Sequence, residues 1–336
     1  MNLILFYLSI FFLIPLLIYF LRKKKKLLSF TGDKHQNYLN NSKVPLVGGI
    51  IVIYTFTIHY NENLIVTLFI FLIFFLGLLS DIKFIKSPNV RMFIQLAIIF
   101  SFVYLIKLDL RETGVIFIDQ ILKYQILKIL FLTFCILIIV NGNNFIDGLN
   151  GLSIGYFIII NLILLISLDH QLIDSNFLMI FLFSKLILLA LNFNNQVFQG
   201  DNGSYLLGFF FGFYLIEIYN QNIFISPFFI ILLLWYPSFE LLFSIIRKFK
   251  IDSSPLHPDN NHLHHLIYFY FYKKTNKQLL SNNLSSLIIN SFNFAILLIG
   301  SAKTSNTQYQ IFLIVIAILF YTMTYVKLNK YKNSNN

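Results

Sequence analysis

Long apolar runs constrain this chain more than any other feature of its sequence. A membrane-spanning helix needs about 20 mostly apolar residues, and eleven runs of that kind follow one another along the chain. Hydrophobic residues make up 57% of the chain and charged residues 12%, which excludes an ordinary water-soluble protein. Because backbone groups in hydrocarbon must be paired within each segment, and the runs lack strand-like alternation, they predict helices. We therefore expect an all-α, polytopic integral membrane protein with eleven transmembrane helices, roughly at residues 3–21, 44–59, 64–80, 92–107, 124–140, 152–168, 176–192, 204–220, 225–246, 280–300 and 308–326.

Basic residues are distributed unevenly among the loops between these runs. Five of them, at 22–26, directly follow the first run, and the positive-inside rule places such a cluster in the cytoplasm. Threading the chain from there puts the N-terminus outside, the C-terminus in the cytoplasm, and a single transmembrane domain over residues 1–336. The net charge of +11 is explained by this asymmetry and by anionic lipid, so no nucleic-acid partner is expected. The expected cytoplasmic loops are at about 22–43, 81–91, 141–151, 193–203 and 247–279.

Four unusually polar segments fall in loops that follow odd-numbered runs. They are GLLSDIKFIKSPNVRMFIQ (77–95), NGNNFIDGLNGL (141–152), LNFNNQVFQGDNGSYLLG (191–208) and SSPLHPDNNHLHHL (253–266). The threading brings all four to the cytoplasmic face, and the outside loops hold no comparable cluster. This one-sided gathering of Asp, Asn, Gly and His is what an interfacial active site needs, since its substrate arrives from one compartment.

The carboxylates of these segments favour a bound cation. Asp81, Asp147 and Asp201 each stand at a helix end, where a lone anion near lipid would be costly. A divalent cation would offset that cost, and hard oxygen ligands suit Mg²⁺, which fills its shell with water and substrate phosphates. The alternative is that each aspartate simply caps a helix or makes a turn.

Glycines beside the carboxylates point to phosphate. Gly148 and Gly151 lie in DGLNG, while Gly200 and Gly203 lie in GDNGS just before a predicted helix. Backbone N–H groups at such a helix start could face an anion, which would make a diphosphate clamp. Ordinary turns are the alternative, since Gly and Asn also form those.

Three histidines, His262, His264 and His265, follow Pro258 and Asp259. A zinc site would need Asp259 or His257 to complete its ligands, because the single cysteine lies far away in an apolar run. In the favoured interpretation the imidazoles donate hydrogen bonds to phosphate oxygens. A third interpretation is a solvated loop without a functional role.

Together with KVPLVGGI (43–50), the four polar segments resemble the polyprenyl-phosphate N-acetylhexosamine-1-phosphate transferases of glycosyltransferase family 4. The resemblance spans about residues 33–266 in order. It implies transfer of a HexNAc 1-phosphate from a UDP-sugar to polyprenyl (undecaprenyl) phosphate with release of UMP. It further implies Mg²⁺, which Mn²⁺ can replace, and the cytoplasmic face of a bacterial inner membrane. The histidine segment is more similar to the glycan-initiating branch, which favours surface-polysaccharide synthesis.

The same resemblance assigns roles to individual residues. Asp201 is the expected metal ligand, with Asp147 as a candidate second one, and Asp81 and Asp147 would position phosphates. His262, His264 and His265 match the family's histidine loop, and Asn192 and Phe198 match positions linked to uridine, where a ring can stack on the base. The expected substrate-binding set is Lys43, Asn144, Gly148, Asn150, Asn192, Phe198, Gly200, Gly203 and Asp259.

Four positions depart from the family pattern. Ser80 replaces the first of two adjacent acids, Asn150 replaces a second Asp, Asn260 replaces an Arg, and Gln196 replaces a basic residue. The missing acid at position 80 is a proposed general base. A phosphate monoester with a second pKa of about 6 is mostly a dianion at neutral pH, so little proton abstraction is required.

Two other functions compete with this reading. A nucleotide-sugar or lipid-linked-sugar transporter would place polar groups at the bilayer midplane, whereas these segments lie at one face. Lys185, Glu217 and Glu240 are the ionisable exceptions within or near the runs, and Glu240 is expected to approach the headgroup region near Arg247. A catalytically inactive paralogue is conceivable because of Ser80. A homodimer is a candidate assembly.

Overall fold

The computed structural model describes residues 3–24, 27–29, 44–59, 64–168, 173–249 and 261–334. In these ranges the regular structure is helical throughout. The extended contacts found there are two isolated β-bridges, Leu28 with Pro45 and Leu46 with Phe198. The predicted all-α class is confirmed.

Each of the eleven apolar runs contains a helix, and two further short helices lie between runs. In chain order the helices are α1 (Leu3–Lys24), α2 (Gly48–His59), α3 (Leu64–Asp81), α4 (Pro88–Leu105), α5 (Ile116–Leu122), α6 (Gln125–Ile146), α7 (Leu152–Ser167), α8 (Ser175–Phe193), α9 (Gly200–Gln221), α10 (Pro227–Leu233), α11 (Trp235–Phe249), α12 (Leu263–Thr275), α13 (Gln278–Ser301) and α14 (Thr307–Ser334).

Six of these helices are long and apolar enough to cross a membrane, namely α3, α4, α6, α8, α13 and α14. The bent pair α10 and α11 makes a seventh if it counts as one span, and α2 and α7 are apolar but shorter. The chain is therefore a multi-pass, all-helical membrane protein. By length and composition, six or seven helices in the described part of the chain could span a membrane. This number is lower than the eleven apolar runs found in the sequence.

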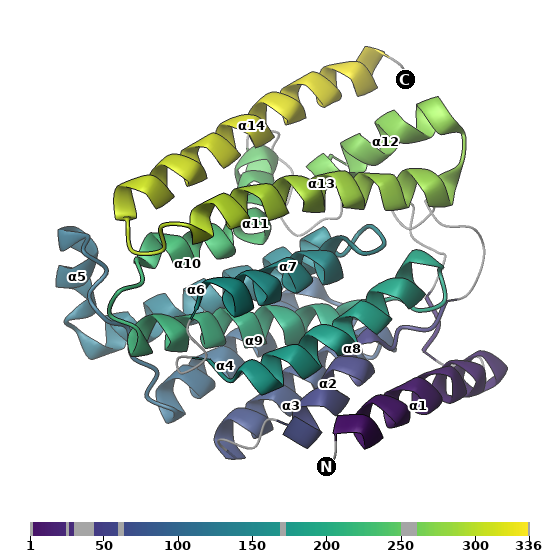
Figure 1. Cartoon of the computed structure of the whole chain (residues 1–336), viewed down its shortest axis with the longest axis horizontal. Helices are drawn as coiled ribbons and strands as arrows, with labels where there is room; N and C mark the ends of the chain where they lie inside the picture. The colour runs from purple at the N-terminus through teal and green to yellow at the C-terminus, as the bar shows by residue number, and fades with distance from the viewer. Residues whose placement is uncertain are drawn as a thin grey trace.

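Helix α9 forms the centre of the bundle. It packs against α2, α3 and α6, and Figure 1 shows α12, α13 and α14 along one edge of the molecule and α1 along the opposite edge. Phe209, Phe210 and Phe211 on α9 are fully buried. Gly208 lets α6 approach closely, since a Cβ there would lie 2.7 Å from the Cα of Val140. Small residues at such contacts are typical of helices that pack by van der Waals contact within lipid.

The run at 225–246 is broken rather than continuous, because α10 and α11 meet at 73°. Pro237 has no N–H, so the carbonyl of Leu233, four residues earlier, loses its helical partner. The Tyr156 hydroxyl takes that place, donating a hydrogen bond to the Leu233 oxygen over 2.9 Å. The break is thus a consequence of one proline, and its free carbonyl is satisfied from α7.

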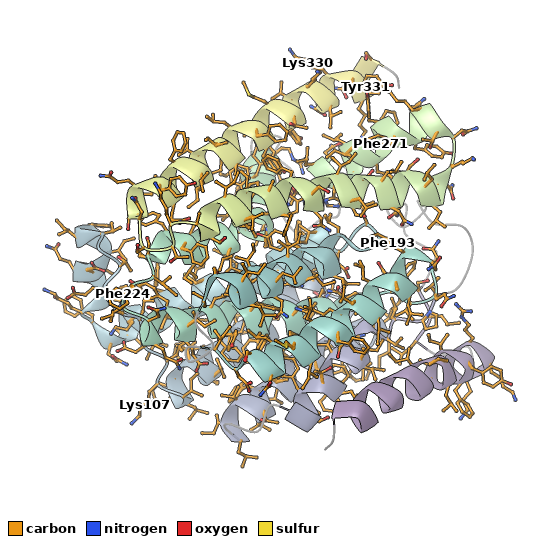
Figure 2. The ribbon with its side chains drawn as sticks, in the orientation of Figure 1. Lys107, Phe193, Phe224, Phe271, Lys330 and Tyr331 are labelled. Carbon is orange, nitrogen blue, oxygen red and sulfur yellow. The ribbon has the colours of Figure 1, made fainter. Side chains whose placement is uncertain are left out.

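The two ends of α9 lie at opposite ends of the molecule. Figure 2 shows Phe193, at the end of α8, on one side and Lys107 and Phe224 on the other. Phe193 precedes the start of α9 by a short loop, whereas Phe224 follows the end of α9. The described parts of the four polar segments lie near the start of α9, as the contacts below show.

Candidate active site

Asp81, the last residue of α3, binds the N-terminus of α9. Its Oδ1 accepts a hydrogen bond from the backbone N–H of Asp201 over 2.9 Å, and its Oδ2 accepts one from that of Asn202 over 3.0 Å. The first N–H groups of a helix lack helical partners and carry partial positive charge, so a carboxylate suits them. Gly200 has φ +73°, and a Cβ there would lie 2.8 Å from Asp81 Oδ2. The expected diphosphate clamp of N–H groups at this helix start is therefore corrected, because Asp81 occupies the N–H groups of Asp201 and Asn202.

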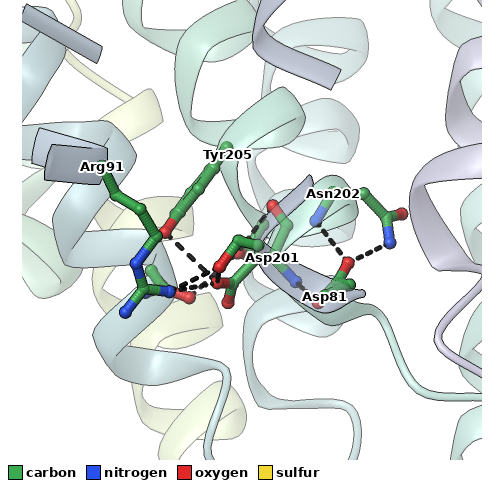
Figure 3. Close-up of polar contacts among 8 residues, drawn as sticks. Asp81, Arg91, Asp201, Asn202 and Tyr205 are labelled. Carbon is green, nitrogen blue, oxygen red and sulfur yellow. Dashed lines mark hydrogen bonds and ion pairs between the residues drawn. The ribbon is translucent and has the colours of Figure 1, made fainter. Parts of the chain in front are cut away.

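Asp201, on the first turn of α9, is held through one of its carboxylate oxygens. Arg91 Nη1 donates to Asp201 Oδ2 over 2.7 Å. The Ser80 hydroxyl donates to the same oxygen, and the Tyr205 hydroxyl does so over 3.3 Å. Figure 3 shows Arg91 and Tyr205 pointing toward Asp201 from different helices. Ser80, at the position of the missing acid, is thus a partner of the predicted metal ligand.

Arg91 is a site residue that reading the sequence missed. It lies at the end of an expected cytoplasmic loop, 81–91, and had no predicted role in the site. Its place in the same polar segment as Asp81, on the first turn of α4 after Pro88, was the available signal.

Asp147, at the C-terminal end of α6, is electrostatically coupled to the other two aspartates. Burial raises the pKa of Asp147 well above its usual value, and the negative charges of Asp201 and Asp81 raise it further. Among the residues that the structure describes, none donates a hydrogen bond to its carboxylate. The structure thus brings together the three aspartates of three separate segments and leaves one of them without a donor.

Two asparagines at the end of α6 form hydrogen bonds with the start of α9. Asn143 Nδ2 donates to the backbone oxygen of Ser204 over 2.6 Å, and the Ser204 hydroxyl donates to Asn144 Oδ1 over 3.1 Å. Asn144 therefore links the loop that carries Asp147 to the helix that carries Asp201.

Asn150 and Asn192 use their amides within the protein. Asn192 Oδ1 accepts from the N–H of Gly151 over 2.5 Å, and its Nδ2 donates to the Val197 oxygen over 2.8 Å. Asn150 Nδ2 donates to Asn195 Oδ1 over 2.7 Å. These bonds tie the Asn-rich loop to the loop before α9. The uridine-binding role of Asn192 stays a prediction.

Phe198 and Gly203 join the segment before α2 to the start of α9. The backbone N–H of Phe198 donates to the Pro45 oxygen over 2.9 Å, and its oxygen accepts from Gly48 over 3.1 Å. A Cβ at Gly203 would lie 2.9 Å from the nitrogen of Gly49. Gly203 therefore serves close packing of α2 on α9. Half-buried Phe198 keeps part of its ring accessible.

The three histidines cluster at the start of α12. The ring centroids of His264 and His265 are 4.2 Å apart, and those of His262 and His264 are 5.4 Å apart. A Cβ at Gly148 would lie 2.8 Å from His264 Nε2, so the histidines face the loop that begins with Asp147. His264 is fully buried, and neither of its ring nitrogens has a hydrogen-bond partner among the described residues. Burial and the neighbouring imidazoles lower the pKa of His264, so its ring is neutral at pH 7.

Glu240 on α11 orients His262. Glu240 Oε1 lies 2.9 Å from His262 Nδ1, and Glu240 Oε2 accepts from the Tyr321 hydroxyl over 2.8 Å. The sequence placed Glu240 near the headgroups but did not show this pairing, because the two residues are separated by a loop and a helix end. A carboxylate on one ring nitrogen fixes the tautomer of a histidine.

Lys43, His257 and Asp259 lie outside the described residues. Among the described residues no three His, Cys, Asp or Glu side chains converge on a point that could hold a metal ion. That finding gives no support to zinc held by the three histidines themselves. A hard cation that takes only one or two carboxylates fits better, because Asp147 has no donor in the described part of the chain and lies near two further carboxylates.

The arrangement of helices and polar side chains defines a class of protein. It is a multi-pass helical membrane protein with a polar centre of aspartates and histidines at one end of its central helix. Residues 63–219 match the model of glycosyl transferase family 4. These residues contain Asp81, Asp147 and Asp201.

Curated relatives cover more of the chain. An Escherichia coli protein named undecaprenyl-phosphate alpha-N-acetylglucosaminyl 1-phosphate transferase is 29% identical over 274 residues, which is 77% of this chain and 74% of the relative. A Thermotoga maritima protein of the same name is 27% identical over 323 residues, 95% of each chain. A Bacillus subtilis protein named as a probable enzyme of this type is 28% identical, over 76% of this chain and 70% of the relative. The chain is thus similar to glycosyl transferase family 4 and to these transferases, which confirms the resemblance that its motifs showed.

Proposed function

We propose that this chain transfers an N-acetylhexosamine 1-phosphate from a UDP-sugar to undecaprenyl phosphate, releasing UMP and leaving a lipid-linked diphosphate sugar. The similarity to the family and the names of the relatives support this reaction. The observation that carries it is that Asp81 and Asp201 meet at one helix start, within electrostatic range of Asp147, whose loop faces His264.

We propose Mg²⁺ as the cofactor, with Mn²⁺ as a substitute, held by Asp201 and by Asp147 as a second ligand. When bound, the cation would neutralise the diphosphate and align it for in-line attack, which is where phosphoryl transfer gains most of its acceleration. Asp147 supports this choice, since a carboxylate without a donor and beside two like charges is stabilised by a cation.

The remaining side chains have separable tasks in this proposal. Asp81 fixes the start of α9, so that Asp201 is held in place relative to α3. His264 is neutral and offers one N–H donor, which suits a phosphate oxygen and leaves the histidine uncharged. Ser80 cannot act as a general base, and the acceptor phosphate needs none because it is mostly a dianion above its second pKa of about 6.

The uridine end of the donor is assigned to the loop before α9. Phe198 offers a partly accessible ring for stacking. Asn192 holds the same loop through Gly151 and Val197, so we propose that it acts there by shaping the loop rather than by direct contact with the base.

The topology belongs to the same proposal. We place the site on the cytoplasmic face of a bacterial inner membrane, with the N-terminus outside, the C-terminus inside and each of the eleven apolar runs crossing once. Residues 1–336 would form a single catalytic domain, and a homodimer is the proposed assembly. The strongly basic sequence at 22–26 supports the inside position of the first loop. A transporter is disfavoured because the ionisable cluster lies at one end of α9 rather than halfway along it.

The experiment is a donor panel. Purified protein is incubated with undecaprenyl phosphate, a divalent cation and UDP-sugars that carry different N-acetylated amino sugars. We expect butanol-extractable product from at least one donor, together with UMP. No lipid product and no UMP from any donor would argue for an inactive paralogue.

A further inference from the structure

Asp201 Oδ2 is saturated by the protein itself. Arg91 Nη1, the Ser80 hydroxyl and the Tyr205 hydroxyl all donate to this one oxygen. A carboxylate oxygen has two lone pairs, so a cation can reach Oδ2 only by displacing a donor, and Oδ1 is the oxygen that these three donors leave open. Figure 3 shows Arg91 and Tyr205 reaching this carboxylate from two sides.

Ser80 joins Arg91 to Asp201. Arg91 Nη1 donates to the Ser80 oxygen as well as to Asp201, and the Ser80 hydroxyl then donates to Asp201 Oδ2. The three side chains form a closed triangle. A hydroxyl can complete it because it both accepts and donates, whereas a carboxylate at position 80 would accept from Arg91 and repel Asp201.

The ion pair of Arg91 with Asp201 is partly shielded from solvent. The side chains of Arg91 and Asp201 are 22% and 23% exposed, so the attraction between them is screened less than that of a surface pair. A divalent cation on Asp201 would lie next to the guanidinium, and the two positive charges would repel each other.

We propose that Arg91, oriented by Ser80, is a positioning residue that competes with the metal ion for Asp201. A metal ion on Oδ1 would share the carboxylate with the guanidinium, and one that took both oxygens would displace Arg91 from Oδ2. In either case the triangle lowers metal affinity and keeps Asp201 paired while the metal is absent. The inference rests on the proposed function in one respect, namely that Asp201 is a metal ligand.

The test measures binding of Mn²⁺ alone, without substrates, by electron paramagnetic resonance on purified full-length protein in detergent. Arg91→Gln should bind Mn²⁺ about tenfold more tightly than the wild type, because a charge-assisted competitor and a like charge are both removed. Ser80→Ala should tighten binding by a smaller factor, since Arg91 remains but loses its bridge. Arg111→Gln, at the other end of the molecule, is the matched control and should leave Mn²⁺ affinity unchanged.

The Asp201→Asn variant separates the claim that Asp201 binds the metal ion from the claim that Arg91 competes with the metal ion. Suppose that Asp201→Asn loses Mn²⁺ binding while Arg91→Gln and Ser80→Ala bind Mn²⁺ as tightly as the wild type or more weakly. That result would overturn the proposed competition but leave Asp201 as the metal ligand. Wild-type Mn²⁺ binding in Asp201→Asn would overturn the metal assignment and the competition with it. Should Arg91→Gln fail to fold, the Ser80→Ala affinity decides, and no tightening there counts against the proposal.

Discussion

The two ends of α9 each bind an arginine, one from the first turn of α4 and one from the loop after α4, but they use it differently. At the start of α9, Arg91 pairs with Asp201 in a group that holds two further carboxylates. At the end of α9, Arg111 donates from Nη2 to the Ile225 oxygen over 2.9 Å and lies 4.2 Å from the centre of the Tyr219 ring. Its backbone N–H donates to Asn220 Oδ1 over 2.9 Å.

The difference separates a reactive end from a structural one. The partners of Arg111 are neutral and satisfied, and the nearby Asp109 is paired with Lys128. At the other end, three aspartates lie close enough to raise the pKa of Asp147, and His264 has unpaired ring nitrogens among the described residues. Polar groups left incompletely matched by the protein mark the place where a ligand would complete them.

The largest contrast between the ends is expected from removing one carboxylate at each. Asp201→Asn should lower the rate of UMP release by at least about a hundredfold, since it removes the charge of the proposed metal ligand. Asp109→Asn should leave that rate within about twofold, because Asp109 is 72% exposed and far from the site. A nucleotide assay on purified variants measures both, and equal losses would erase the distinction between the ends.

A pair of glycines gives the next largest contrast. Gly200 and Gly114 both have φ +73°, but a Cβ at Gly200 would meet Asp81, whereas no atom lies within 4 Å of one at Gly114. Gly114→Ala should destabilise the protein by about 1 kcal/mol, the cost of a left-handed alanine. Gly200→Ala should cost about 2 to 4 kcal/mol, because the Asp81 cap must also shift. Thermal unfolding in detergent gives the comparison, and similar costs would show that the contact at Gly200 is unimportant.

Arg111 is expected to matter for stability and not for catalysis. Arg111→Ala removes a hydrogen bond to a backbone carbonyl and a contact with the Tyr219 ring, so we expect a loss of about 1 to 2 kcal/mol. UMP release measured at a temperature where the variant stays folded should match the wild type. A specific loss of turnover in the folded variant would mean that this end also serves the reaction.

The smallest effect is expected from the ion pair of Lys128 with Asp109. The hydrogen bond from Lys128 lowers the pKa of Asp109, so any stability it provides is present above the pKa of the unfolded chain and lost as the pH falls through the lower folded value. Because Asp109 is 72% exposed, Lys128→Ala should change stability by no more than about 0.5 kcal/mol. High salt should abolish even that difference, and a larger, salt-independent loss would contradict this account.

The sequence predicted the helical class and the segments of the site for a physical reason. Polar residues between apolar runs stand out, since a lipid-embedded chain tolerates them only where they are used. Asp81, Asp147 and Asp201 were found in this way, as was His264. Their position on one face was predicted only from the order of the apolar runs along the chain.

Details that depend on contacts between helices were not predictable from local sequence. The role of Arg91 depends on the approach of α4 to α9, and that of Glu240 depends on how α11 meets α12. The sequence predicted an open anion-binding site at the N-terminus of α9. Nothing in GDNGS reveals that Asp81, 120 residues earlier, caps this helix. The bend before Pro237 was predictable in principle, because a proline inside an apolar run removes a helical hydrogen bond.

The central claim is that the start of α9 is a site of sugar-phosphate transfer. The most direct measurement reconstitutes the protein in vesicles with undecaprenyl phosphate, labelled UDP-sugar and Mg²⁺, and quantifies UMP, lipid-linked sugar and free nucleotide sugar in one reaction. We predict one UMP for each lipid-linked sugar, with both lost in Asp201→Asn. Entry of intact UDP-sugar into the vesicles without UMP or lipid product would contradict the account.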